Sequence, residues 1–214
     1  VSAVPEGLPI VVTLVMVVGS LALVRQKTLV RYLPSVETLG SATVIVSDKT
    51  GTITEGRLAV QEVHALDRES LLQAAVLCND ASGGAGDPVD LALIRWAEGS
   101  GEILAHNPRI WVYPFDTKKK LMATANRTAQ GDRFFIKGAY EEVRKCAENT
   151  GDFAGLEAAL DHMAGRGLRV LAFGAGDHDS DGTGRWKYRI VGLIGFADPP
   201  KESVATAVLE AQKA

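Results

Sequence analysis

Residues 42–54 read ATVIVSDKTGTIT, an unbroken apolar and β-branched run that ends on Asp48 and Lys49. Such a run, here Ala42 to Ser47, is typical of a strand buried inside a parallel sheet. In an open α/β sheet the carboxyl ends of the strands face the ligand crevice. The sequence therefore predicts an α/β fold in which Asp48 stands at the functional edge of an open sheet.

Asp48 opens the pentapeptide DKTGT, and Lys49, Thr50, Gly51 and Thr52 form the loop that follows it. An aspartate in this position can act as a covalent nucleophile toward a phosphoryl group, with Mg²⁺ reducing the repulsion between the two anions. Gly51 lets the backbone close around phosphate. The alternative is an ordinary strand-to-turn exit with a solvated carboxylate, which the rarity of such a pentapeptide disfavours.

Composition narrows the classes of function. The chain has 214 residues, of which 46% are hydrophobic, and a formal net charge of -3. A mildly acidic body without a basic stripe is poorly suited to nucleic acid, so we expect no nucleic-acid partner. Cys78 and Cys146 fit neither a disulfide framework nor a zinc ligand set, which favours a reducing compartment.

The uncharged run from Gly7 to Val24 is just long enough to cross a bilayer. A signal peptide needs positive charge before such a run, whereas here the cations of residues 25–31 follow it. A buried core helix is the other alternative, although such a helix usually keeps one polar stripe. The sequence therefore predicts a transmembrane helix whose C-terminal end lies in the cytoplasm.

That helix opens with Pro5-Glu6-Gly7-Leu8-Pro9. The two prolines block the helical ladder, so carbonyls near Val1 to Val4 lack intrahelical partners. Together with the Glu6 carboxylate they suit a hard or alkali cation at membrane depth. Glu6, Val4 and Val1 are thus candidate ligands of a transported cation; alternatively, Glu6 lies among lipid headgroups and binds nothing.

Several motifs, in this order and spacing, resemble the core of the P-type cation-transporting ATPases, most closely the calcium-pump branch. They are PEGLP at 5–9, LPSVETLG at 33–40, SDKTGTIT at 47–54, PFD with KKLM at 114–122, FIKGA at 135–139, GLRVLA at 167–172 and DPPK at 198–201. DKTGT with PEGLP is highly specific, and the resemblance covers essentially the whole chain. It implies an ATP-driven pump in which ATP phosphorylates Asp48 to an aspartyl phosphate, with ATP and Mg²⁺ as cofactors.

The resemblance also implies a nucleotide site. Phe115 occupies the place of the family's adenine-stacking ring, and Asp90 that of an acidic residue that reaches the adenine amino group. The other positions that match the family's nucleotide site are Lys120, Lys137, Gly138, Arg169 and Asp198. Mg²⁺ would be held partly by Asp48 and the Thr50 carbonyl. Taken singly, Phe115 is more typical of a core residue, and each cation of a solvated surface charge.

Three positions depart from the family pattern. Asp90 replaces the usual Glu, Thr117 stands where an Arg is frequent, and Lys201 replaces an Arg. Because Asp90 is one methylene shorter, its direct contact with adenine is left open. These departures point to weak affinity for ATP.

Two other segments resemble known binding motifs, but each lacks a residue that the motif requires. Residues 177–182 copy the opening of an EF-hand loop, but the twelfth position is Tyr188 where a bidentate Glu is required, so we expect a hairpin loop. Residues 82–86 are glycine-rich but lack the Lys-Ser/Thr of a P-loop, which indicates a flexible connection.

The predicted organisation is a transmembrane helix followed by a partial, doubly wound haloacid-dehalogenase-like phosphorylation domain with an inserted α/β nucleotide-binding domain. The boundaries are 1–24 for the membrane helix, 25–33 for a stalk, 34–60 and 198–214 for the two parts of the phosphorylation domain, and 61–197 for the insertion. Helices are expected near 69–78, 88–98, 139–147, 154–164 and 201–213, and strands near 110–115, 121–127, 133–137, 168–173 and 186–196. Asp198-Pro199-Pro200 is expected to form a rigid return hinge.

We expect an integral membrane protein with residues 25–214 in the cytoplasm, and a fragment that alone neither transports nor turns over efficiently. Its partners would be the bilayer, the transported cation and the remaining actuator, phosphorylation and membrane segments of a pump. Ca²⁺ is favoured, whereas Mn²⁺, Mg²⁺, Na⁺ and K⁺ stay open. The alternatives are a soluble haloacid-dehalogenase-like phosphatase and a non-catalytic nucleotide-binding module.

Overall fold

The computed structural model describes residues 7–97, 99–148, 153–177 and 187–213. The chain divides into two compact units, residues 1–47 and residues 48–214. Each unit is described by itself. The predicted cation ligands Glu6, Val4 and Val1 lie outside the described residues, as does most of the loop that copies an EF-hand opening.

The first unit contains helices α1 (Leu8–Arg25) and α2 (Ser35–Gly40). Pro9 lies in the first turn of α1, where a missing N–H costs little, and the Thr13 hydroxyl donates to the Pro9 carbonyl at 2.8 Å. No residue of α1 is buried. By length and composition, α1 is the one helix of the described residues that is able to cross a membrane.

The predicted strand over residues 42–47 is absent, and this prediction was wrong. The segment has no regular structure, and Val44, Ile45 and Val46 are 74%, 74% and 92% exposed. A strand obtains its hydrogen bonds from neighbouring strands. Among the described residues every strand belongs to one antiparallel sheet formed by residues 59–197, so no parallel neighbour is available here.

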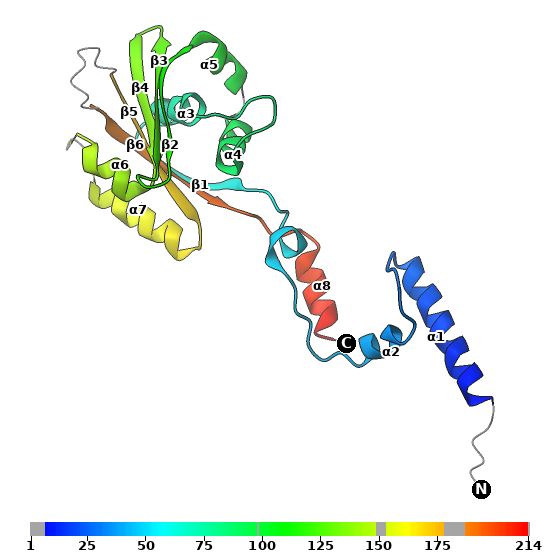
Figure 1. Cartoon of the computed structure of the whole chain (residues 1–214). Coiled ribbons are helices and arrows are strands. Elements are labelled where there is room, and N and C mark those ends of the chain that lie inside the picture. Colours follow the sequence, from blue (N-terminus) through cyan, green and yellow to red (C-terminus); the bar gives the residue numbers. More distant parts are fainter. Residues whose placement is uncertain (1–6, 98, 149–152, 178–186, 214) are drawn as a thin grey trace. The chain divides into compact units, whose positions relative to one another are not determined.

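The second unit is built on that six-stranded sheet (Figure 1). Its order is β1-β6-β5-β4-β3-β2, and all neighbours are antiparallel. The strands are β1 (Ala59–Ala65), β2 (Arg109–Asp116), β3 (Leu121–Thr128), β4 (Gly131–Gly138), β5 (Arg169–Asp177) and β6 (Arg189–Ala197). The structure confirms the five predicted strands and adds β1, within which the predicted domain boundary at residue 60 falls.

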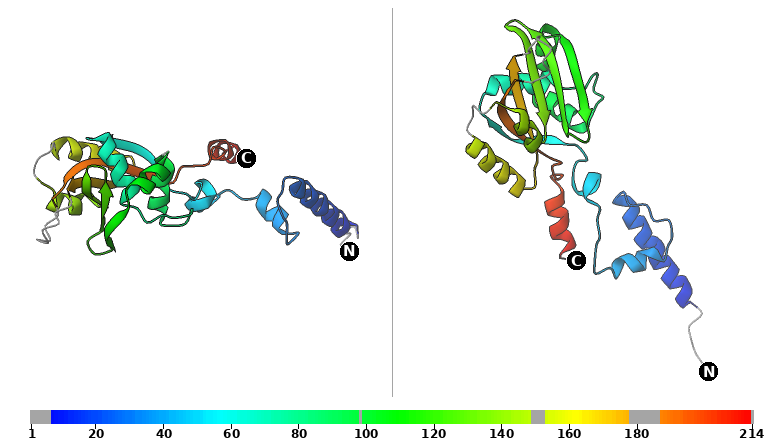
Figure 2. Two further views of the ribbon diagram at one scale, coloured as in Figure 1. Left: turned by 90° about the horizontal axis from the view of Figure 1, so that it is seen from above. Right: turned by 60° about the vertical axis from the view of Figure 1, so that its left-hand side comes forward.

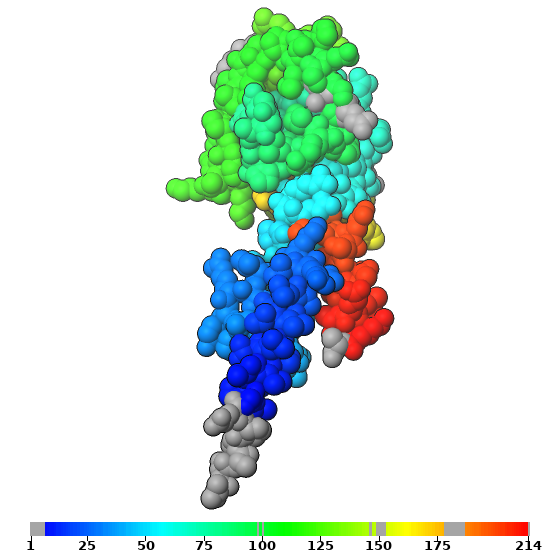
Figure 3. Space-filling view, turned by 90° about the vertical axis from the view of Figure 1, so that its right-hand side faces the viewer, coloured from blue at the N-terminus to red at the C-terminus, as the bar shows by residue number. Residues whose placement is uncertain are grey.

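Helices cover both faces of the sheet. They are α3 (Arg68–Leu77), α4 (Pro88–Trp96), α5 (Ser100–His106), α6 (Tyr140–Cys146) and α7 (Phe153–Gly165). A further helix, α8 (Val204–Ala211), follows the last strand and has no buried residue. Helices α3 to α5 lie on one face, whereas α6 and α7 lie on the other (Figure 1). Figure 3 faces the first of these sides, where the cyan and green atoms of α3 to α5 cover the sheet.

Successive residues of the central strands feed two separate cores. Phe135 of β4 and Phe173 of β5 pack with α3 and α4, whereas Phe134 and Ala172 pack with α6 and α7. This follows from the two-residue period of a strand, which sends neighbouring side chains to opposite faces. The doubly covered sheet explains why these strands read as continuous apolar runs.

The chain enters and leaves the sheet along two adjacent segments, also visible in Figure 2. Thr54 and Pro200 form an antiparallel bridge, and the Glu55 N–H donates to the Pro199 carbonyl at 2.9 Å. The Lys201 N–H donates to the Ile53 carbonyl, also at 2.9 Å. Entry and exit thus run together, and residues 53–57 and 198–201, the two hinge segments, are joined by these hydrogen bonds.

Candidate functional site

A cavity of about 580 Å³ opens at one end of the sheet, where β3, β4 and β5 meet the start of α4. Its walls bring together most of the residues that the sequence predicts for the nucleotide site: Asp90, Phe115, Lys120, Lys137, Gly138 and Arg169. They come from five different elements or turns, so the chain has to fold for them to meet. The volume lies within the range typical of small-molecule sites.

The floor of the cavity is an ion pair between Lys137 of β4 and Asp90 of α4. Their side chains are only 7% and 8% exposed, and the Lys137 Nζ donates to Asp90 Oδ1. The second carboxylate oxygen of Asp90 accepts from the backbone N–H of Asp80 at 2.9 Å. Charges buried to this degree have to be paired and hydrogen-bonded, and here both conditions hold.

The start of α4 places Asp90. Asp87 is the N-cap of that helix and accepts from the Val89 N–H at 2.9 Å, and Pro88 occupies the first helical turn. The sequence DPVD thus begins the helix at this point. It also puts Asp90 in the first turn, close to the positive end of the helix dipole.

The rim of the cavity is formed by the turn between β2 and β3. Asp116 holds this turn: Oδ1 accepts from the N–H groups of Lys118 and Lys119 at 2.8 and 3.1 Å, and Oδ2 accepts from the Tyr113 hydroxyl at 2.9 Å. These hydrogen bonds, led by that from Lys119, lower the pKa of Asp116. Phe115 precedes the turn, lines the cavity and is 55% exposed, so part of its side chain is available to a ligand.

Gly138 is required by backbone packing. A Cβ at this position would lie 2.5 Å from the Lys120 carbonyl oxygen and 2.8 Å from the Leu121 Cα. The close approach lets Leu121 pair with Gly138 across β3 and β4, and the Ala139 N–H donates to the same Lys120 carbonyl at 3.0 Å. Gly138 also lines the cavity, so the missing side chain leaves room there for the neighbouring strand.

Lys120 and Arg169 line the same cavity at exposed positions. In the part of the chain that the structure describes, neither forms an ion pair with a carboxylate. Thr117 also lines the cavity, so the departure from Arg leaves a hydroxyl there in place of a further cation. The cavity thus has a neutralised floor and a cationic rim.

The Asp48 loop is a separate site that does not line this cavity. Residues Lys49–Ile53 form a single irregular helical turn in which Gly51 has a φ of 76°, a value that favours glycine. The Lys201 Nζ donates to the Gly51 carbonyl at 2.6 Å. Carboxylate and carbonyl oxygens such as those of Asp48 and Thr50 are the donors that Mg²⁺ prefers.

Asp198 belongs to the hinge and not to the cavity. Its Oδ2 accepts from the Thr54 hydroxyl at 2.5 Å, and its Oδ1 accepts from the N–H groups of Gly56 and Arg57 at 3.0 and 3.1 Å. The sequence interpretation grouped Asp198 with the nucleotide contacts. Its hydrogen bonds instead fasten the two hinge segments together.

Sequence reasoning missed Asp80 and Met122, which also line the cavity. Asp80 follows α3 in a loop without a recognisable motif, and Met122 belongs to a continuous run of buried residues in β3. Behind Met122 lies Cys78, whose thiol donates to the Met122 carbonyl at 3.4 Å. Burial raises the pKa of this thiol to about 11, so it stays protonated at neutral pH.

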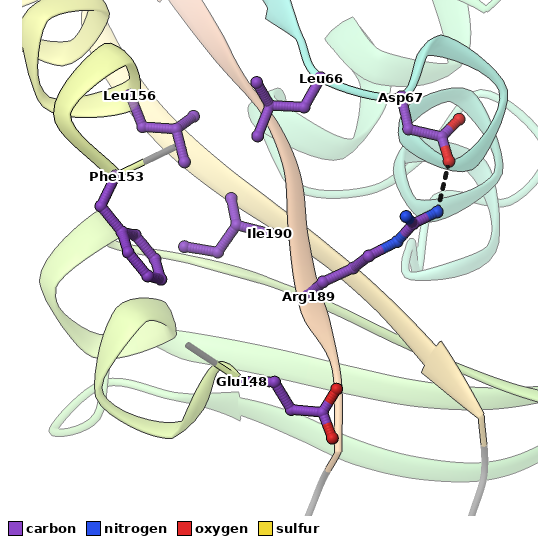
Figure 4. Close-up of a pocket in the computed structure, with 7 residues that line it drawn as sticks. All are labelled: Leu66, Asp67, Glu148, Phe153, Leu156, Arg189 and Ile190. Atoms are coloured by element: carbon purple, nitrogen blue, oxygen red, sulfur yellow. Dashed lines mark hydrogen bonds and ion pairs between the residues drawn. The ribbon is translucent and has the colours of Figure 1, made fainter. Parts of the chain in front are cut away.

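A smaller cavity of about 140 Å³ lies between the start of α7, β6 and the segment after β1 (Figure 4). Phe153, Leu156 and Ile190 give it an apolar wall, and Arg189 points away to pair with Asp67 at 2.8 Å. It contains none of the residues that the sequence predicts for a site.

Comparisons with known proteins agree with the motifs. A family model described as "P-type ATPase, cytoplasmic domain N" matches residues 67–203. "Calcium-transporting ATPase 1" of Lactococcus lactis is 32% identical over all of this chain and 29% of that protein. "Calcium-transporting ATPase lmo0841" of Listeria monocytogenes is 31% identical over 100% of this chain and 29% of its own length. "Cation-transporting ATPase pma1" of Synechocystis is 32% identical over 97% and 30%. The chain thus spans about three tenths of the relatives it matches.

Proposed function

The chain belongs to the P-type ATPases, and from that membership we propose that it binds ATP in the cavity between Asp90 and Arg169 and accepts the γ-phosphoryl group on Asp48. The observation that carries the first part is the convergence of Asp90, Phe115, Lys120, Lys137 and Arg169 on one cavity. These residues lie far apart in the sequence, and the resemblance to the family implies a place in the nucleotide site for each of them.

The polarity of the cavity orients the nucleotide. Val89, Met122 and Leu171 give its walls an apolar character, and Phe115 offers a ring for stacking. The adenine base lies in this apolar part of the cavity, next to the Asp90–Lys137 pair. The polyphosphate lies at the rim, where Lys120 and Arg169 offset its negative charge.

The chemical step is phosphoryl transfer. A carboxylate oxygen of Asp48 forms a bond to the γ-phosphorus, and the bond between that phosphorus and the β,γ-bridging oxygen of ATP breaks, so ADP leaves. Asp48 and the Thr50 carbonyl would hold Mg²⁺, which would supply charge neutralisation between the two anions. Gly51 keeps the loop compact, and Lys201 anchors its carbonyl.

We further propose that phosphorylation drives cation transport, with Ca²⁺ favoured because the most similar relatives include proteins named calcium-transporting ATPases. In this proposal α1 crosses the bilayer, residues 25–214 lie in the cytoplasm, and Glu6 with the carbonyls of Val4 and Val1 contributes to the ion site. The haloacid-dehalogenase-like fold of the phosphorylation domain, and the actuator and further membrane segments, are part of the same proposal.

The test is acid-stable labelling with γ-³²P ATP in the protein isolated in its native membrane. Asp48→Asn is expected to abolish the label, because an amide cannot act as the nucleophile. Asp132→Asn, which removes an exposed carboxylate paired with Arg127, is the matched control and is expected to keep the label. Label retained in Asp48→Asn contradicts the assignment, and ATP binding without any label indicates a non-catalytic nucleotide-binding module.

A further inference from the structure

Arg109, the first residue of β2, holds the loop that follows α3. Its Nη1 donates to Asp80 Oδ1 at 2.6 Å, and its Nη2 donates to the carbonyls of Asn79 and, at 3.4 Å, of Leu77. The planar guanidinium thus contacts three acceptors of one short loop, a geometry that an ammonium group does not reproduce. The last carbonyls of a helix lack intrahelical partners, and that of Leu77 accepts from the Thr124 hydroxyl at 3.2 Å as well as from Arg109.

The backbone just before Arg109 is held by hydrogen bonds to β3. The Arg127 N–H donates to the Pro108 carbonyl at 3.0 Å, and the Asn126 side chain donates to the Asn107 carbonyl at 2.9 Å. These bonds fasten the start of β2 to β3, whose other end borders the cavity. The Arg109 side chain therefore reaches the loop from a strand that the sheet holds in place.

The same loop holds Asp90 in two ways. The Asp80 N–H donates to Asp90 Oδ2 at 2.9 Å, and the Asn79 side chain donates to the Asp90 carbonyl at 3.0 Å. With Oδ2 occupied, Oδ1 is the oxygen that faces Lys137. A continuous set of hydrogen bonds thus runs from Arg109 through residues 79 and 80 to the cavity floor.

We propose that Arg109 is a positioning residue for the nucleotide cavity, acting through the loop of residues 77–80 to fix the Asp90–Lys137 pair. It also pairs with the Asp80 carboxylate, which lines the cavity and would otherwise present an uncompensated negative charge to ATP. This inference rests on the proposed binding of ATP in the cavity. Arg109 itself does not line the cavity, so its effect is indirect.

The experiment compares Arg109→Ala, Arg109→Lys and the control Arg127→Ala in the 214-residue chain. Arg127 also pairs with an aspartate of the same sheet, at 3.0 Å, but has no hydrogen bond to the loop. Isothermal calorimetry gives the affinity for ATP, and amide hydrogen exchange reports on the loop. We expect Arg109→Ala to weaken ATP binding about tenfold and Arg109→Lys to have an intermediate effect, with Arg127→Ala unchanged.

Hydrogen exchange separates positioning from general destabilisation. We expect the Asp80 amide to exchange faster in Arg109→Ala, while the amides of β3 and β4 keep their protection. Unchanged ATP affinity in Arg109→Ala overturns the inference, and so does a loss of protection across the whole sheet. If the unmodified chain fails to bind ATP, the proposed function fails first and the role of Arg109 falls with it; if that chain binds and the variant binds equally well, only the role of Arg109 is wrong.

Discussion

The cavity of the sheet domain and the segment before the Asp48 loop differ in how far their residues are buried and paired. The cavity floor is closed by partners within the same fold: Asp90 and Lys137 neutralise each other and are more than nine-tenths buried. The segment that leads into Asp48 has Val44, Ile45 and Val46 exposed. The difference teaches that the residues around the cavity are paired and buried within one sheet domain, whereas residues 43–46, before Asp48, have no strand partner among the described residues.

Lys137→Met gives the strongest test of that contrast. The variant leaves Asp90 as an unpaired buried charge, so we expect the free energy of unfolding to fall by about 3–5 kcal/mol. Urea unfolding followed by circular dichroism measures the change. The control is Arg127→Met, which breaks an exposed pair with Asp132 and is expected to cost about 1 kcal/mol or less. Equal losses in the two variants would contradict a closed, internally neutralised floor.

Phe115→Ala separates binding from stability in the same cavity. The ring is 55% exposed, so we expect little change in the free energy of unfolding. Loss of stacking on the base is expected to weaken ATP binding by about 1–3 kcal/mol. Calorimetric titration with ATP measures it, and Trp111→Ala, on the same strand but outside the cavity, is the comparison. An unchanged affinity in Phe115→Ala would remove the ring from the proposed site.

Val46→Asp tests the segment that leads into Asp48 and has the smallest expected effect on stability. Val46 is 92% exposed, so we expect the free energy of unfolding to stay within about 0.5 kcal/mol, and the amides of residues 42–47 to exchange rapidly. Val191→Asp is the matched substitution at a fully buried position and is expected to destabilise the sheet strongly. Slow exchange at residues 42–47 would show that the segment pairs as a strand after all.

Short-range patterns predicted most of the sheet domain. The runs that became β3 to β6 contain continuous stretches of buried residues, and DPVD has the residues of a helix cap and first turn, which it forms in α4. Strand β1 and helix α5 were missed because their residues show weaker local patterns, and β1 becomes a strand by pairing with β6. The resemblance to the P-type ATPases pointed to Phe115, Lys120, Lys137 and Arg169 as nucleotide-site residues. It did not specify how they are arranged in space.

The sequence by itself determined the local chemistry of this protein: the DKTGT loop, the apolar helix α1 and the set of charged and aromatic residues for a nucleotide. Only the tertiary structure decided that Asp90 pairs with Lys137, 47 residues away, that Arg109 holds the loop beside them, and that Asp198 fastens the hinge. It also decided that residues 42–47 form no strand. The physical reason is the same in each case: an ion pair or a strand needs a partner from another part of the chain, and no local pattern specifies where that partner lies.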